Sequence, residues 1–270
     1  MKKMMNWVMA AALICSSTVF TSCSKDDNPV NPADNLAKMI IGKWISTEMD
    51  GRPLMTNSKA VFTFVSATKV YMSTSINKNP GSEFWGDQLE GDVVIDGNKI
   101  TITNKTGEQM TTAIEFIVTA INKYEFFAKR KMTVMVYDKV VFSLDDTVRY
   151  AKVNVDYSEA ILGTWEGHVT NSEGSEYDDG ETHRWEYKAD GTYVYYSQNE
   201  EGEWVPSGDE ISEYFVDGTL LCTRWGNNEQ EFREWWEIVS IKNDVMKWKA
   251  LRQKEDGSTY TATFEMKKVE

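Results

Sequence analysis

The chain of 270 residues has few residues that cross-link or bend a backbone, with only three cysteines and five prolines. The cysteines are Cys15, Cys23 and Cys222, so no even set of pairs exists and disulfides do not hold the fold together. Basic charge is also scarce, because 29 Lys and Arg face 42 Asp and Glu, a net charge of −13. Phosphate binding needs a basic stripe, so this balance argues against nucleic acid as a partner.

Motifs for catalysis and metal binding are missing from the sequence. It has two histidines, His168 and His183, and no HExxH, zinc-knuckle or glycine-rich phosphate pattern. If Trp165 pairs with Tyr187 on the next predicted strand, His168 lies opposite Arg184, and alternation puts the two imidazoles on different faces. We therefore expect no shared metal, no cofactor and no enzymatic activity.

No apolar run is long enough to span a bilayer. The N-terminus instead combines Lys2 and Lys3 with a short apolar run from Trp7 to Ile14, which is the pattern of a signal peptide. We expect this signal peptide to cover residues 1–22. Because the pattern directs export, we expect the rest of the chain to lie outside the cytoplasm.

The segment that ends the signal, Phe20-Thr21-Ser22-Cys23, resembles a bacterial lipobox, with Phe20 at the position where that family usually has Leu. Cys15 is the competing cysteine, but Ile14 before it is too large for the cleavage pocket. The resemblance implies that Cys23 is acylated and holds the protein on a membrane, at about 0.8 kcal/mol per buried methylene. The alternative is a plain secreted protein that is cut nearby.

A flexible acidic tether is expected over residues 23–37, because its stretch SKDDNPVNPADN has few apolar groups to bury. Its Ser-Lys-Asp-Asp start also resembles the surface-export signal of lipoproteins from the Bacteroidota. The alternative is a solvated spacer that faces the periplasm. We therefore expect an outer-membrane lipoprotein that faces either the cell surface or the periplasm.

The rest of the chain is a repeat. Gly42-x-Trp44 returns as Gly163-x-Trp165, and three further segments follow in the same order at an offset of about 120 to 123 residues. This predicts two domains, 38–155 and 156–270, each of ordinary domain size. The further matches are 62–73 with 185–197, 93–103 with 213–223, and 116–131 with 236–254.

Each copy consists of about eight short segments rich in Val, Ile, Thr and aromatics, which predict strands, and we expect no helix beyond a turn near Asn35–Ile40. In the second copy Asp190-Gly191, Asp217-Gly218 and Asn243-Asp244 predict tight hairpin turns. Every second link between the strands is long. In an up-and-down meander alternate links lie at the same end of the barrel, so we expect the long loops to share one rim. The predicted fold is all-β, with two tandem eight-stranded up-and-down antiparallel barrels.

A Gly-x-Trp that opens the first of eight meandering strands resembles the lipocalin and wider calycin group, and more specifically bacterial lipoproteins with lipocalin-like domains in tandem. The resemblance covers residues of about 38 to 268 and implies that Gly42, Trp44, Gly163 and Trp165 are structural. Lipocalins also pack an Arg from near the last strand on that Trp. The candidates for this role here are Lys267 and Lys268 in the second copy and Arg149 in the first.

Seven of the ten tryptophans lie in the second copy. With Trp165 inward, pairing parity turns Trp185 and Tyr187 inward, and a two-residue turn after them brings in Tyr196. Core filling is one interpretation of these aromatics, and an aromatic-lined pocket away from Trp165 is the other. The candidate ligand-binding residues are Trp185, Tyr187, Tyr196, Trp248 and Phe264.

The second copy also holds the acidity, with 26 acids against 11 bases from Asp156 onward. Its loops carry Glu173, Glu176, Asp178, Asp179, Glu181, Glu200, Glu201 and Glu203, either as a calcium site or cation-seeking mouth, or as a solvated rim.

We expect a monomer that binds a small hydrophobic molecule or a glycan fragment without catalysis. The alternative is a structural or protein-interaction module of the envelope with filled barrels, and an enzyme ranks third. We expect Cys222 to be a small, buried hydrophobic residue.

Overall fold

The computed structural model describes residues 32–74, 88–170, 180–227, 229–254 and 256–269. Cys23, the signal segment and most of the predicted tether lie outside these residues, as do Glu173, Glu176, Asp178 and Asp179. No helix in the described part of the chain is both long enough and apolar enough to cross a membrane.

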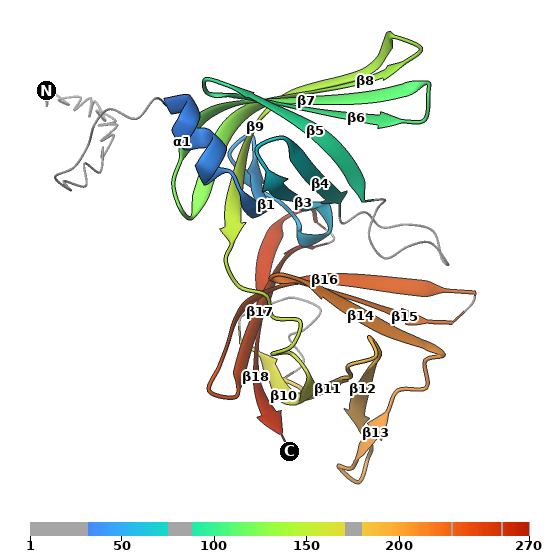
Figure 1. The fold of residues 1–270 in the computed structure, drawn as a ribbon. Coiled ribbons are helices and arrows are strands. Elements are labelled where there is room, and N and C mark those ends of the chain that lie inside the picture. Colours follow the sequence, from blue (N-terminus) through green and yellow to red (C-terminus); the bar gives the residue numbers. More distant parts are fainter. Residues whose placement is uncertain (1–31, 75–87, 171–179, 228, 255, 270) are drawn as a thin grey trace, which may run out of the picture. The chain divides into compact units, whose positions relative to one another are not determined.

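Strands are the dominant element of the structure, and they form two antiparallel sheets (Figure 1). The helix α1 (Pro32–Met39) precedes the first sheet, so the predictions of a flexible tether as far as residue 37 and of no more than a turn near Asn35–Ile40 are wrong for these residues. A single 3₁₀ turn, η1 (Thr56–Ser58), lies within the first sheet. The first sheet contains β1 (Gly42–Met49), β2 (Arg52–Pro53), β3 (Ala60–Ser66), β4 (Lys69–Thr74), β5 (Leu89–Asp96), β6 (Lys99–Thr106), β7 (Met110–Ile121), β8 (Glu125–Val136) and β9 (Lys139–Val153). The second contains β10 (Gly163–Val169), β11 (His183–Tyr187), β12 (Tyr193–Gln198), β13 (Trp204–Pro206), β14 (Ile211–Asp217), β15 (Leu220–Gly226), β16 (Glu231–Lys242), β17 (Val245–Gln253) and β18 (Thr259–Val269).

The first sheet is a closed barrel. Its strands follow one another from β1 through β3 to β9, and β9 pairs back onto β1, while β2 is a short addition to β1. The long β4–β5 link does not interrupt the closure, because the two strands pair from Lys69–Asp92 to Met72–Leu89. Closure leaves no long unpaired edge among these eight strands.

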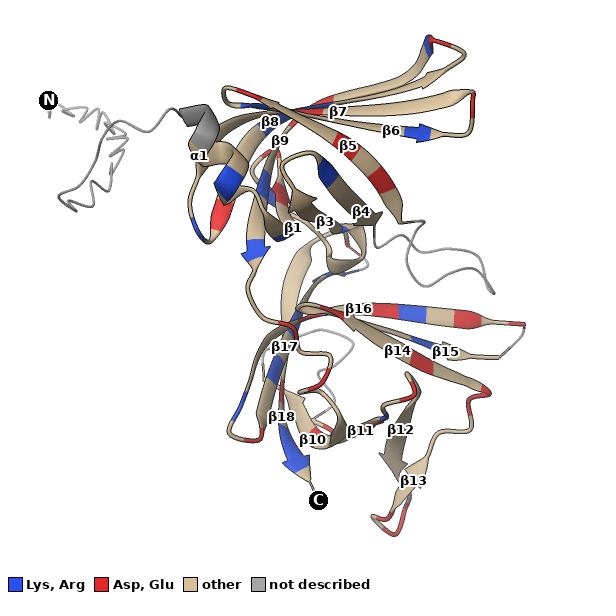
Figure 2. Ribbon diagram, viewed as in Figure 1, with Lys and Arg blue, Asp and Glu red and all other residues tan. Residues whose placement is uncertain are grey.

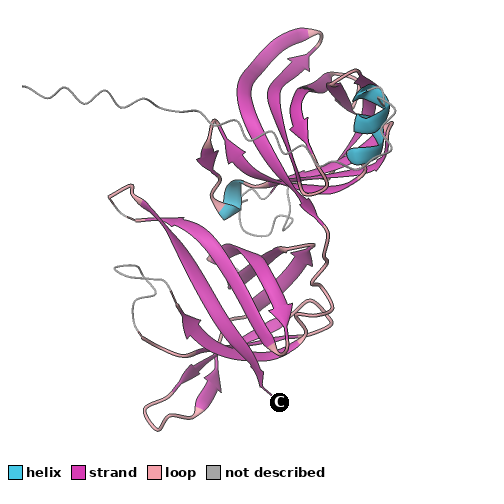
Figure 3. Cartoon of the chain, turned by 90° about the vertical axis from the view of Figure 1, so that its left-hand side faces the viewer, coloured by secondary structure: helices cyan, strands magenta, loops and turns pink. Residues whose placement is uncertain are grey.

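The second sheet repeats the order but stays open along one side. Strand β10 pairs with both β11 and β18, as the predicted barrel requires. Between β12 and β14 the described residues make one isolated bridge, Thr192–Glu213. The predicted all-β architecture of two tandem up-and-down barrels is therefore confirmed, with the difference that the second sheet curls without closing (Figure 3).

The Gly-x-Trp motifs have the same geometry in both copies. The indole nitrogen of Trp44 donates to the carbonyl oxygen of Ile40 at 2.6 Å, and that of Trp165 donates to Ile161, also at 2.6 Å. Both indoles are buried, at 0% and 1% exposure. Each Trp thus ties the turn before its strand to the end of its barrel, which is a structural role.

A lysine from the last strand covers each of these indoles. Lys152 Nζ lies 5.0 Å from the Trp44 ring centroid, and Lys268 Nζ lies 5.4 Å from that of Trp165. The prediction of Lys268 is therefore confirmed, and that of Arg149 is wrong. Arg149 lies three residues before Lys152 on β9 and bonds Glu48 and Glu125 instead.

The glycine of each motif makes room for that lysine. Gly42 and Gly163 have φ angles of 124° and 110°, which side chains rarely adopt. A Cβ added at Gly42 would lie 2.9 Å from Lys152 Cε, and one at Gly163 would lie 2.8 Å from Lys268 Cε. Glycine is needed here for both backbone conformation and space.

The first barrel is filled by its own side chains. Trp44, Phe62, Phe116, Phe126 and Tyr150 meet in a network of ring contacts, with Trp44 and Phe126 centroids 5.0 Å apart. All five are buried at 5% exposure or less. This packing is the interior that a closed barrel without a ligand requires.

Candidate functional site

The two barrels differ at one pair of inward positions. In the first, Ile102 on β6 pairs with Ile114 on β7, two residues along from the Ile100–Phe116 pair. In the second, Thr223 on β15 pairs with Glu234 on β16, two residues along from Leu221–Trp236. A polar pair therefore occupies the interior position that two isoleucines fill in the first copy.

A cavity of about 240 Å³ lies at this polar pair. Its lining comes from β11, β12, β15 and β16 and from the segment just before β14, so it borders the side where the sheet is open. The lining residues are His183, Trp185, Tyr193, Tyr195, Asp209, Thr223, Trp225 and Glu234.

A second, deeper cavity of about 30 Å³ shares part of this lining. Trp185, Thr223 and Glu234 line both, so the two spaces adjoin. The deeper lining is completed by Tyr187, Trp236, Trp248 and Phe264. Four of the five predicted ligand-binding residues, all except Tyr196, are therefore brought together around one space.

Tyr196 lies on the other face of its strand, and the prediction that it turns inward is wrong. The β11–β12 turn has three residues, Ala189 to Gly191, because the backbone N–H of Lys188 bonds the carbonyl of Thr192. This turn pairs Trp185 with Tyr195 instead of Tyr196.

The hydroxyl of Tyr196 donates to Glu186 on the outer face at 2.7 Å. The odd turn length reverses the predicted parity. Tyr193 and Tyr195 are therefore the inward tyrosines of β12, as their place in the lining shows.

The register of β10 also differs from the predicted one, by two residues. Trp165 pairs with Trp185 rather than Tyr187, and Gly167 pairs with His183 rather than Trp185. An even shift preserves the faces. His168 is accordingly exposed and His183 is buried at 7% exposure, so the prediction that the imidazoles lie on different faces is confirmed.

Trp185 is fixed among other rings. Its centroid lies 5.2 Å from Tyr195, 5.3 Å from Trp248 and 5.6 Å from Phe264, the last two edge to face. His183 stacks beside it at 5.5 Å. Such contacts hold an aromatic wall in one orientation, which suits a preformed binding surface.

Polar groups converge on the same space. His183 Nδ1 and the Tyr195 hydroxyl are 3.1 Å apart. Glu234 accepts from Trp236 Nε1 at 3.1 Å and from Arg252 at 2.8 Å. Burial raises the pKa of Tyr193, and the charges of Glu234 and Asp209 raise it further, which keeps this hydroxyl neutral.

Two polar atoms of the deeper lining have no hydrogen-bond partner among the described residues, namely Tyr187 Oη and Trp248 Nε1. Both side chains are 2% exposed. Burial raises the pKa of Tyr187 well above its usual value, so its hydroxyl stays protonated. Buried polar atoms normally have partners, and the adjoining space is large enough for one water or one ligand oxygen.

The described acidic loop residues stay in solvent. Glu181, Glu200, Glu201 and Glu203 are all exposed. Figure 2 marks acidic residues on several strands of the second sheet, β14 and β16 among them, and in the β12–β13 turn. In the described ranges no three His, Cys, Asp or Glu side chains gather as a metal ion would require. Among the described loop carboxylates, Asp209 lines the cavity.

Cys222 is fully buried on β15, which confirms the prediction of a small buried hydrophobe. Burial raises the pKa of its thiol well above the usual value. A protonated, inaccessible thiol is a poor nucleophile and a poor metal ligand.

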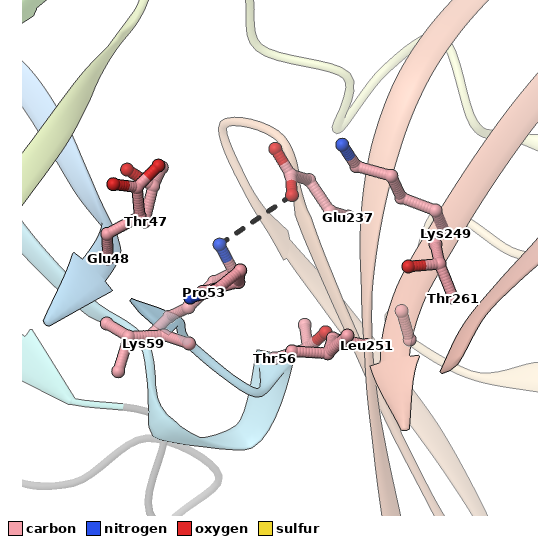
Figure 4. A pocket seen from close by; sticks show the side chains of 11 residues that line it. Thr47, Glu48, Pro53, Thr56, Lys59, Glu237, Lys249, Leu251 and Thr261 are labelled. Atoms are coloured by element: carbon pink, nitrogen blue, oxygen red, sulfur yellow. Dashed lines mark ion pairs between the residues drawn. The ribbon is translucent and has the colours of Figure 1, made fainter. Parts of the chain in front are cut away.

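Another pocket, of about 270 Å³, is lined by residues of both sheets (Figure 4). Lys59 Nζ lies 3.7 Å from Glu237 there and also donates to the carbonyl of Ser46 at 3.3 Å. Burial lowers the pKa of Lys59, and Glu237 opposes that shift. Lys59 and Glu237 pair with each other, and no aromatic side chain is found among the described residues that line the pocket, so this pocket is the weaker candidate.

Comparison with known proteins adds no name to this site. Neither the scan against protein-family models nor the search of curated proteins found a match to the chain.

Proposed function

We propose that this protein is an exported, lipid-anchored binding protein, and that its second barrel takes a small hydrophobic molecule or a glycan fragment without catalysing a reaction. The lipobox-like segment before Cys23 supports export and anchoring in the outer membrane. The observation that carries the binding proposal is the aromatic cavity at the open side of the second sheet.

The contrast between the copies strengthens this proposal. The first barrel closes and fills its interior with Phe, Tyr and Ile, whereas the second opens at β12–β14 and places Thr223 and Glu234 inside. Aromatic walls with a few convergent polar groups are the usual features of small-molecule sites. Ring faces also suit both apolar ligands and the apolar faces of sugars.

The test is a thermal-shift screen of the soluble chain against apolar small molecules and oligosaccharides. We expect binders that raise the Tm of the wild type but not that of Thr223→Ile. This variant gives the cavity the isoleucine that the first barrel has at the equivalent position, Ile102. Thr263→Ile is the matched control, because Thr263 lies between the inward Ala262 and Phe264 and faces outward. If both libraries leave the wild type unshifted, or shift Thr223→Ile equally, the proposal is wrong.

A protein-interaction module is the second candidate, and an exposed apolar stretch favours it. Val140, Val141 and Phe142 on β9 are 60%, 61% and 46% exposed, and Tyr137 in the turn before them is 65% exposed. Exposed apolar side chains gathered in one hairpin are typical of segments that contact other proteins. Crosslinking from a photoreactive residue at position 141 in whole cells tests it, and the candidate fails if no crosslinked partner forms.

A further inference from the structure

The lining of the two adjoining cavities has an uneven charge. Among the described residues it contains two carboxylates, Asp209 and Glu234, and no lysine or arginine. Glu234 is partly neutralised by Arg252, but Asp209 makes no ion pair with any described residue. The space therefore carries uncompensated negative charge at the Asp209 side.

Nearby arginines are engaged elsewhere. Arg224, on the strand that supplies Thr223 and Trp225, pairs with Glu213 and Glu231 on the outer face. Arg184, between His183 and Trp185, pairs with Glu166 and lies over the Trp204 ring at 4.4 Å. Alternation keeps both guanidinium groups on the face opposite the cavity, so neither can compensate Asp209 from inside.

Four aromatic rings complete this lining, those of Trp185, Tyr193, Tyr195 and Trp225. Ring faces attract cations within about 6 Å of the centroid, most strongly when the cation is desolvated. Aromatic faces beside a carboxylate form the arrangement that recognises ammonium groups. The 26 acids and 11 bases from Asp156 onward add a negative field that attracts cations to the same domain.

The deep end of the cavity also presents hydrogen-bond donors. Trp248 Nε1 can only donate, and it has no hydrogen-bond partner among the described residues. A ligand oxygen, or a water behind the ligand, would satisfy it together with the neighbouring Tyr187 hydroxyl. The two cavities thus offer carboxylate acceptors, with Glu234 lining both, and hydrogen-bond donors at the deep end.

We propose that this cavity selects organic cations, meaning small molecules that carry a protonated amine or quaternary ammonium beside an apolar group. The ammonium lies among the rings near Asp209, and the apolar part rests on Trp185. This inference rests on the proposed binding function and narrows it to one ligand class.

Isothermal titration at pH 7 with three probes of one shape tests the selection: phenethylammonium, 2-phenylethanol and phenylacetate. We expect the cation to bind about tenfold more tightly than the neutral alcohol, and the anion more weakly than either. Salt should reduce the preference for the cation. Asp209→Asn should remove most of it, whereas Glu210→Gln, the same charge change one residue away and outside the lining, should leave it within about twofold.

Different failures have different meanings. Equal or tighter binding of the alcohol, or an Asp209→Asn variant that keeps the preference, overturns cation selection and leaves cavity binding intact. If no probe binds while members of the apolar or oligosaccharide libraries still stabilise the wild type, the ligand class is wrong and the binding function stands. If neither the probes nor the libraries bind, both proposals fail.

Discussion

The indole of Trp185 on β11 meets the indole of Trp248 on β17 edge to face, with their centroids 5.3 Å apart. Trp185 lines both cavities of the second barrel, and Trp248 lines the deeper one. This contact therefore forms part of the wall between the outer space and the barrel interior. A ligand that enters the outer cavity would rest on Trp185, and its presence should alter the tryptophan emission of the protein.

Truncating this wall should weaken both binding and folding. Trp185→Ala removes a half-buried indole that touches four rings, so we expect a loss of about 2 kcal/mol in unfolding free energy and a loss of ligand binding. Urea unfolding measures the first effect, and titration measures the second. Trp204→Ala, on the outer face over Arg184, is the control and should cost less than about 1 kcal/mol. Equal effects of the two changes would contradict the assigned role of Trp185.

Alkaline pH should destabilise the protein through its buried tyrosines. Burial raises the pKa of Tyr150 to about 12, against 10 for an exposed phenol. Between pH 10 and 12 the unfolded state has then lost a proton that the folded state keeps, so stability falls as pH rises, by up to about 1.4 kcal/mol per pH unit for each such group.

Tyr150→Phe should remove the part of this loss of stability that comes from Tyr150. The urea midpoints of the variant should therefore decline less steeply from pH 9.5 to 11.5 than those of the wild type. At pH 7 the change should cost little, since no hydrogen bond of ordinary geometry to the Tyr150 hydroxyl is found among the described residues, and the nearby Arg130, which opposes the rise in its pKa, keeps its ion pair with Asp146. An unchanged slope in Tyr150→Phe would contradict this account.

The glycine of the Gly-x-Trp motif should be intolerant of substitution. Gly163→Ala forces a Cβ onto a φ of 110° and against Lys268, so we expect about 2 kcal/mol of destabilisation. Gly208→Ala is the matched control, because a Cβ there meets nothing within 4 Å. Thermal unfolding compares the two variants, and equal Tm values for Gly163→Ala and Gly208→Ala would contradict this explanation.

Lipid attachment can be tested by metabolic labelling with a clickable fatty acid. We expect label on the wild type and on Cys15→Ala, and none on Cys23→Ala, because acylation needs the Cys23 thiol. Label that persists in Cys23→Ala would refute the lipoprotein proposal.

The sequence was sufficient to predict the fold because the same pattern of motifs and strands occurs in both copies. The paired Gly-x-Trp motifs, the strand count and the inward parity of Trp185, Tyr187 and Trp248 all follow from alternation and spacing. The error at Tyr196 arose because Asp190-Gly191 also fits a three-residue turn with Gly191 at a φ of 82°. The lysine on Trp44 depends on a register along β9 that spacing does not set.

The opening of the second sheet was not predicted, because composition does not reveal whether β12 and β14 meet across a long link. One available signal was missed. Aligning the copies by their inward faces sets Thr223 and Glu234 against Ile102 and Ile114, and this replacement of two apolar residues by polar ones marks the cavity.

Native mass spectrometry of the protein purified from the cells that make it tests the central claim most directly. We expect a bound small molecule on the wild type and on Thr263→Ile, and its absence from Thr223→Ile, which replaces a hydroxyl by a larger ethyl group in the cavity that Trp185 and Glu234 also line. A wild-type protein that carries only the mass of its polypeptide and acyl chains, or a bound molecule that persists in Thr223→Ile, would contradict it.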